Sequence, residues 1–276
     1  VPQGSTLTVV IQGQGTVSPN LNGNSLMIGQ SYTMTATPAT GYEFAGWSGN
    51  IPGSPSSAAA LSFVMTSNLV LQATFIASPY TAAAGTYNGL FFESDEVRVN
   101  SAGAFNLRAE LNGNYSGWLQ IGYARYSFSG KLSVDLSATN VITRWNATPV
   151  NLSIRLGQGS EAGQIAGDVS DGVWSSSLAG GRTTTNSLFA GDYTVVIPGV
   201  TGSAQIPSGD SYATLHVAAD GLATMNGTLA DGSQFMQSAY ITEQGDWPMC
   251  VSLYAAKGAV VSWIHFADLS NSDLRG

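Results

Sequence analysis

Hydrophobic and polar residues alternate along most of this chain. This is the pattern of β-strands with one buried face and one solvent-exposed face. In residues 31–37, Tyr32, Met34 and Ala36 face one way, while serine and threonine face the other. Residues 150–156 repeat the pattern, with Val, Leu or Ile at every second position. No stretch keeps a helical period over the roughly 11–18 residues that identify a helix. The pattern therefore predicts an all-β protein.

Short dipeptides that favour tight turns separate the alternating runs. An Asn or Asp followed by Gly tolerates the positive φ angles of two-residue hairpin turns. Such pairs begin at Asn112, Asp171, Asp220, Asn226 and Asp231. Consecutive strands are therefore predicted to be antiparallel neighbours.

A small, apolar, turn-rich segment divides the chain into two differently patterned regions. It contains Ala-Ser-Pro at 77–79 and Ala-Ala-Ala-Gly at 82–85. Segments of this composition are typical of domain boundaries. We expect a small β-rich domain at 1–77, followed by a larger antiparallel β-barrel or β-sandwich at 80–276.

Four landmarks follow one another in the first region. They are Gly-Gln-Gly-Thr-Val-Ser-Pro at 13–19, Gly29 with the strand at 32–38, Gly-Tyr-Glu-Phe-Ala-Gly-Trp-Ser-Gly at 41–49, and an alternating run at 69–75. Together they resemble a divergent internalin-type B repeat (InlB B-repeat). The resemblance covers the first quarter of the chain. It implies a small β-rich module of bacterial surface and secreted proteins, usually a spacer or adhesion accessory and not a catalyst.

The second region contains a weak internal duplication. Gly-Thr-Tyr at 85–87 in the first copy corresponds to Gly-Asp-Tyr at 191–193 in the second. Further along, Ala-Gly at 102–103 corresponds to Asp-Gly at 220–221. A duplicated meander of short strands explains this echo, and such a meander folds as a barrel or a sandwich. The region is similar to exported β-proteins of environmental bacteria, a resemblance that implies no particular activity.

The composition predicts a surface of uncharged polar side chains. Charged residues make up 9% of the sequence and hydrophobic residues 43%, against roughly 25% charged residues in typical globular proteins. The net charge is −8, and lysine occurs only at Lys131 and Lys257, so no basic patch is available for a phosphate backbone. No apolar run approaches the roughly 20 residues that span a bilayer. We expect neither a nucleic-acid partner nor membrane insertion.

Residues that could bind a metal or act in catalysis are scattered. His216 and His265 lie in alternating runs without a partner at ligand spacing, and Cys250 lies in an apolar run that favours a buried, unreactive thiol. Asp168 and Asp171 lack the interleaved ligands and the closing Glu of a calcium loop. No nucleophile elbow, phosphate-binding loop or dinucleotide fingerprint occurs. We expect no metal, no cofactor and no enzymatic activity.

The densest acidic group consists of Glu93, Asp95 and Glu96. Two carboxylates that face each other across a cleft can hydrolyse a glycosidic bond. Carboxylates crowded into one short stretch instead favour a solvated loop near a strand end.

Aromatic residues offer the alternative of a carbohydrate-binding or host-binding surface. An aromatic ring packs well against the C–H face of a sugar. Trp118, Tyr123 and Tyr126 lie close together in sequence and are the possible ligand-stacking residues. For Trp174 and Trp247 a place in the hydrophobic core is expected.

The last alternating run, residues 260–266, is followed by a polar segment, which predicts a second domain without a closing strand. An unpaired strand edge can bind a strand of another chain, and Leu7, Val9 and Ile11 form a candidate inter-subunit strand. The leading hypothesis is a non-catalytic structural or adhesive protein that assembles with copies of itself into a fibre or surface layer.

The chain begins at Val1 and not at Met, as expected for an exported protein whose signal peptide has been removed. With the repeat resemblance, this predicts a secreted or cell-surface bacterial protein.

Overall fold

The structure is a computed structural model that describes residues 3–52, 54–202, 208–269 and 272–276. The chain divides into two compact units, Val1–Thr81 and Ala82–Gly276. In the described residues, strands are accompanied only by one short α-helix, α1 (Tyr80–Ala83), and one 3-10 turn (Gly159–Glu161). The predicted all-β fold class is confirmed.

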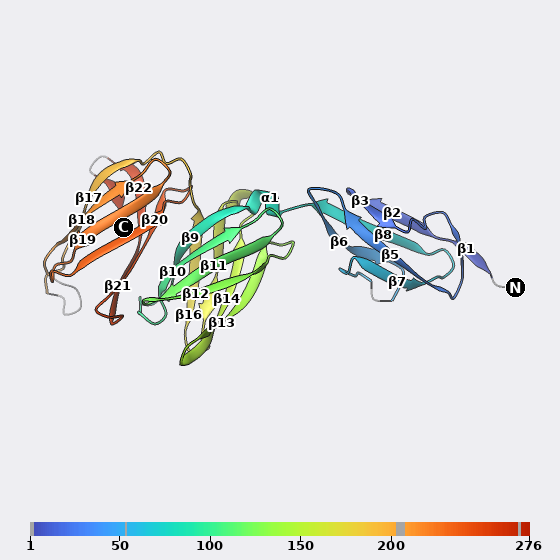
Figure 1. Ribbon diagram of the computed structural model, residues 1–276, viewed down its shortest axis with the longest axis horizontal. Helices are drawn as coiled ribbons and strands as arrows, with labels where there is room; N and C mark the ends of the chain where they lie inside the picture. Colours follow the sequence, from blue (N-terminus) through green and yellow to red (C-terminus); the bar gives the residue numbers. More distant parts are fainter. Residues whose placement is uncertain (1–2, 53, 203–207, 270–271) are drawn as a thin grey trace. The chain divides into compact units, whose positions relative to one another are not determined.

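The first unit contains two three-stranded sheets, ordered β2-β8-β6 and β3-β5-β7, and a two-stranded ribbon of β1 and β4 (Figure 1). The strands are β1 (Gly4–Thr6), β2 (Thr8–Gln12), β3 (Gly15–Ser18), β4 (Ser25–Met27), β5 (Ser31–Pro38), β6 (Tyr42–Gly49), β7 (Ala60–Val64) and β8 (Val70–Ala77). Strands β2 and β8 are parallel. The pairs of β8 with β6, and of β5 with β3 and β7, are antiparallel.

Aromatic rings fill the core of the first unit. Phe44 contacts Trp47 and Phe75, with ring centroids 5.8 and 5.5 Å apart. The buried indole of Trp47 donates a hydrogen bond from Nε1 to the Ala59 carbonyl, 3.1 Å away. Met34 in β5 is fully buried while its neighbours on the other face are exposed, so the alternation of residues 31–37 predicted the buried face of this strand.

The second unit begins with an eight-stranded antiparallel sheet in the order β12-β11-β10-β9-β16-β15-β14-β13. Its strands are β9 (Gly85–Phe92), β10 (Gly103–Ala109), β11 (Asn114–Ile121), β12 (Ala124–Lys131), β13 (Ser137–Arg144), β14 (Ala147–Leu156), β15 (Gln164–Ser170) and β16 (Ser175–Arg182). Figure 1 shows this sheet curling on itself in green and yellow. It is a nearly closed, barrel-like sheet.

Side chains connect the two edges of the eight-stranded sheet. The Tyr115 hydroxyl donates to Oδ1 of Asn140 at 2.7 Å. Nδ2 of the same asparagine donates to the Ser129 carbonyl at 3.0 Å. Asn140 lies in β13 and Ser129 in β12, so one amide joins the two edge strands of the barrel-like sheet.

Two smaller sheets complete the second unit, with strand orders β17-β18-β19-β20 and β21-β22-β23. Their strands are β17 (Gly191–Ile197), β18 (Ser211–Val217), β19 (Leu222–Thr228), β20 (Gln234–Tyr240), β21 (Asp246–Leu253), β22 (Gly258–Leu269) and β23 (Ser272–Arg275). They share one core that includes Leu215, Met225, Trp247 and Phe266. We call these two sheets the C-terminal sandwich.

The meanders β9–β12 and β17–β20 begin alike. The Tyr87 hydroxyl donates to the Ala83 carbonyl and the Tyr193 hydroxyl to the Phe189 carbonyl, each at 2.8 Å and each four residues upstream. The turn at Asn112 joins the second and third strands of the first meander, and the turn at Asp220 does so in the second. The register differs from the expected one, because residues 102–103 lie at the start of β10 and not in the turn that matches Asp220.

Most of the predicted Asx-Gly turns occur, but one does not. Gly113, Gly172, Gly221 and Gly232 have φ angles between 82° and 89° in turns. Asn226 and the glycine after it lie inside β19, so the turn predicted there is wrong.

Candidate interaction site

The aromatic residues singled out in the sequence do not form one platform. Trp118 in β11 lies beside Arg125, whose guanidinium carbon is 4.2 Å from the ring centroid. Tyr126 is paired with the buried Leu119, so it faces the interior of the barrel-like sheet, opposite to Trp118. Tyr123 lies in the connecting turn and is 61% exposed. Trp118 borders an open depression of about 550 Å³ whose lining also includes Arg108, Ser116, Ser127 and Phe128.

The candidate inter-subunit strand is part of the first unit. Leu7 is fully buried and Val9 is 8% exposed, whereas Ile11 is 46% exposed. Val9 and Ile11 pair with β8. On the other side, the Val9 amide donates to Oδ1 of Asn22 at 2.8 Å. A strand released from this position would lose the burial of Leu7 and Val9, which is worth about 1.5–3 kcal/mol for each side chain.

Strand β22 has an edge that is paired over only part of its length. It pairs with β21 from Gly258 to His265. On its other side, it pairs with β23 only from His265 to Leu269. Within the described part of the chain, no strand pairs with that side of residues 258–264. The prediction that the second domain lacks a closing strand is corrected, because residues 272–275 fold back as β23 and close one end of the edge.

An apolar groove opens beside this unpaired edge, between β17 and the sheet of β22 and β23. Its volume is about 310 Å³. Its lining includes the apolar side chains of Val195, Ile197, Met249, Val260, Ile264 and Leu274, together with the polar residues Ser262, Ser272 and Arg275. Val195 and Val260 are only half-buried, whereas Leu215 in the closed part of the same core is 1% exposed. We call this groove the β22 groove.

The cysteine and the two histidines each have a separate environment. Burial raises the pKa of the Cys250 thiol to about 11, so the thiolate is scarce at neutral pH. Nδ1 of His216 lies 2.7 Å from Asp192, and Nδ1 of His265 lies 2.8 Å from Asp246. No group of three His, Cys, Asp or Glu side chains in this part of the chain could hold a metal ion.

The acidic cluster surrounds one arginine. Arg98 forms ion pairs with Glu93, Asp95 and Glu96 at 2.9, 2.9 and 3.1 Å. The hydrogen bond from Arg98 lowers the pKa of Asp95. The carboxylates therefore neutralise a neighbouring cation and do not face one another across a cleft.

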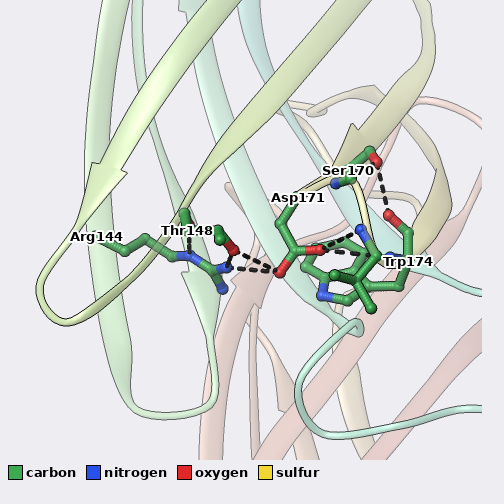
Figure 2. A network of polar contacts seen from close by, with 7 residues as sticks. Arg144, Thr148, Ser170, Asp171 and Trp174 are labelled. Atoms are coloured by element: carbon green, nitrogen blue, oxygen red, sulfur yellow. Dashed lines mark hydrogen bonds and ion pairs between the residues drawn. The ribbon is translucent and has the colours of Figure 1, made fainter.

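Sequence reasoning missed a polar network that fixes two neighbouring turns of the eight-stranded sheet (Figure 2). Nη2 of Arg144 lies 2.8 Å from Oδ2 of Asp171, and both side chains are only 9% exposed. Oδ2 of Asp171 also accepts a hydrogen bond from Thr148 at 3.2 Å. Its Oδ1 accepts the backbone amides of Val173 and Trp174 at 3.0 and 3.3 Å.

The two fixed turns expose large apolar side chains. Trp145, next to Arg144, is 91% exposed, and Val173 is 87% exposed. We call these two residues the turn knob. The available signal was the Arg-Trp-Asn sequence at 144–146, a tryptophan among turn-forming residues, where Asn146 adopts a φ of 52°.

The first unit combines glycine turns with the Phe44, Trp47 and Phe75 core on β6 and β8. Residues 5–79 match the divergent InlB B-repeat domain. The predicted resemblance is thereby confirmed, and the InlB B-repeat domain lies within the first unit. Searches of curated proteins and of solved structures found no protein similar to this chain.

The InlB B-repeat domain is typical of surface proteins, and its presence is consistent with a bacterial surface protein. Among the described residues, no helix is both long and apolar enough to cross a membrane.

Proposed function

We propose that this is a non-catalytic structural or adhesive protein of the bacterial exterior whose copies associate through the β22 groove. The observation that carries the proposal is the apolar β22 groove, in which the side chains of Val195 and Val260 are half-buried. A groove of this kind offers burial for the side chains of an added segment. The InlB B-repeat domain supports an extracellular location.

Association at this groove would be head-to-tail. The groove lies in the C-terminal sandwich, and the part of the next copy that fills it comes from elsewhere on the molecule. A contact between two different surfaces leaves both partners with one free surface each, so it extends into a filament or layer unless a ring closes. This architecture suits a fibre or surface-layer subunit.

The proposed role requires no catalysis. Glu93, Asp95 and Glu96 are engaged by Arg98, and the pKa of the Cys250 thiol is raised by burial. Uncharged hydroxyl and amide groups dominate the polar residues. Such a surface suits a structural protein, and the proposal includes neither cofactor nor metal.

The test is the assembly state of the purified chain. We expect the mass measured by light scattering to rise with protein concentration, and filaments or sheets to be visible by electron microscopy. Val260→Lys places a charge in the groove, so this variant should stay monomeric. Tyr212→Lys adds the same charge at a site that is 62% exposed and outside the groove, and it should assemble like the wild type.

Near-ultraviolet circular dichroism establishes that both variants are folded. A wild-type chain that stays monomeric at the highest attainable concentration would contradict the proposal. So would a folded Val260→Lys variant that assembles as well as Tyr212→Lys.

A carbohydrate-binding or host-binding function is the second candidate, favoured by the open depression beside Trp118. On a glycan array, wild-type binding that Trp118→Ala abolishes and Tyr123→Ala leaves intact would support it. The matched control is apt because Tyr123 is exposed but does not line the depression. An array without any hit would count against this function.

A further inference from the structure

Cations without a counter-charge gather on one part of the barrel-like sheet. Among the described residues, the Lys and Arg side chains that form ion pairs are Arg98, Arg144, Arg155 and Arg182. Those that form none in this part of the chain are Arg108, Arg125, Lys131, Lys257 and Arg275. Arg108 lies in β10, and Arg125 and Lys131 lie in β12. Strands β9 to β12, as the structure bounds them, contain no Asp or Glu, so they carry only positive charge in a chain whose net charge is −8.

The two arginines lie on either side of Trp118. Trp118 in β11 is paired with Asn106 in β10 and with Ser127 in β12. Arg108 and Arg125 are each two residues from one of these partners, so they share the outer face of the sheet with Trp118. Such diagonal neighbours are roughly 7–8 Å apart, which is within reach of long and aromatic side chains. We call the outer surface formed by Arg108, Trp118 and Arg125 the cationic face.

Two open depressions meet at Arg108. The 550 Å³ depression beside Trp118 includes Arg108 in its lining. A second depression of about 890 Å³ also includes Arg108 and extends over residues of β9, the strand next to β10 on the side away from β11. Two carboxylates border the second depression, and one of them, Glu243, is ion-paired with Arg182 at 2.9 Å. Depressions that continue across several strands suit a chain-like ligand better than a single small molecule.

The side chains of the cationic face correspond to the groups of an acidic sugar. The ring of Trp118 is a surface for the C–H groups of a pyranose. The guanidinium of Arg108 is exposed, and a guanidinium binds a carboxylate through two parallel hydrogen bonds. The half-buried amide of Asn106 and the exposed hydroxyl of Ser116 border the same depression and can bind sugar hydroxyls. A polymer with a carboxylate on each sugar presents all three groups repeatedly along its length.

We infer that the cationic face binds an acidic polysaccharide, with Trp118 under a sugar ring and Arg108 on a carboxylate. The inference rests on the carbohydrate-binding function named above as the second candidate, and it specifies the class of sugar. Because the whole chain is negatively charged, a polyanion is repelled by most of the molecule and attracted where cations lack counter-charges. Charge complementarity therefore selects this face.

The experiment compares acidic polysaccharides with their methyl esters, because esterification removes the charge of each carboxylate and keeps the sugars. The polymers are polygalacturonate, alginate and hyaluronan, and binding to the full-length chain is measured by isothermal titration calorimetry. The wild type should bind at least one acid form about tenfold more tightly than its ester, as expected for one hydrogen-bonded charge. Raising the salt from about 0.1 M to about 1 M shortens the Debye length from roughly 10 to 3 Å and should remove most of this preference.

Three full-length variants separate the charge from the ring. Arg108→Gln should lose most of the preference for the acid form and bind the ester as the wild type does. Arg155→Gln is the matched control, because Arg155 already has Glu161 as a counter-charge at 3.3 Å, and it should keep the preference. Trp118→Ala should weaken the binding of acid form and ester alike, since the ring contacts the sugar and not its charge. Near-ultraviolet circular dichroism establishes that each variant is folded.

The outcomes distinguish the inference from the carbohydrate-binding function. Equal binding of acid forms and esters would overturn the inference while that function stands. An Arg108→Gln variant that retains the full preference would also overturn it. So would equal affinity for polyacrylate, which has carboxylates but no sugar, because the face would then be a general polyanion site. If none of the acidic polymers binds, the inference fails, and if a glycan array also gives no hit, the carbohydrate-binding function fails with it.

Discussion

Asp171 shows how one residue can hold two turns together. Partial desolvation raises the pKa of its carboxyl group, but hydrogen bonds from the Val173 amide, Arg144 and the Trp174 amide outweigh this effect and lower the pKa below its usual value. A carboxyl group whose folded pKa is depressed stabilises the fold above its unfolded pKa. That stabilisation is lost as the pH falls through the folded pKa.

Replacing Asp171 by Asn should therefore destabilise the protein in a pH-dependent way. The variant leaves the largely enclosed Arg144 without a counter-charge, which we expect to lower the free energy of unfolding by about 2 kcal/mol at pH 7. Urea denaturation followed by circular dichroism should show this difference shrinking as the pH falls below about 4, the usual pKa of an aspartate, and through the lower folded pKa.

The control for this measurement is Asp192→Asn. Asp192 also pairs with a basic side chain, His216, but its own side chain is 87% exposed, so little change in stability is expected. A loss in Asp171→Asn that is the same at pH 7 and pH 2 would show that the charge of Asp171 is not what stabilises the two turns.

At the scale of single strands, glycine pairs make room for large rings. Gly89 in β9 is paired with Gly180 in β16. A methyl group on Gly89 would lie 2.6 Å from the Gly180 Cα and 2.7 Å from the Phe105 ring, and it would overlap the Ala179 carbonyl oxygen. The interior of the barrel-like sheet accommodates Phe105 because neither glycine has a side chain.

Gly89→Ala should accordingly cost about 1–3 kcal/mol or more, the usual penalty for overpacking against backbone that cannot move away. Gly209→Ala is a fitting control, because its added methyl group would meet only the Ala230 Cβ at an ordinary 3.4 Å. Thermal unfolding of the two variants compares them directly. Equal melting temperatures would rule out tight packing at Gly89.

The sequence was informative where structure is decided locally. In the turns at Asn112 and Asp220, the side-chain Oδ1 accepts a hydrogen bond from the backbone amide two residues later, at 2.9 and 3.1 Å. This interaction involves only the dipeptide and its immediate neighbours. Asn226 begins the same kind of dipeptide, yet it lies in a strand. A methyl group on Gly227 would overlap the ring of Phe235 on the next strand, so packing overrode the local signal.

The pairing register of β11 and β12 explains why the predicted aromatic platform does not form. Alternation places residues of one strand on two faces, but only the pairing of Leu119 with Tyr126 shows that Trp118 and Tyr126 face opposite ways. Register across a turn depends on turn geometry, which the local pattern around Tyr123 does not specify. Because the sequence does not reveal this register, it predicted one ligand-stacking surface that contained both Trp118 and Tyr126.

For the whole molecule, the sequence left barrel and sandwich as alternatives, and the second unit contains both. The barrel-like sheet depends on the pairing of β9 with β16, where Tyr87 lies opposite Arg182. Neither hydrophobic alternation nor turn dipeptides encode a contact between segments so far apart along the chain. The β22 groove was unpredictable for the same reason, because β17 and β22 line it from opposite ends of the sandwich sequence.

Strand β9 is enclosed on both faces, with every residue from Tyr87 to Phe91 buried. Its Asn88 donates from Nδ2 to the Tyr240 carbonyl at 2.6 Å, and β21 lies against it. A fragment that ends after β16 would expose Leu90 to solvent. A fragment that begins at β17 would lack strand β9, against which β21 packs. We therefore expect neither meander to fold without the other.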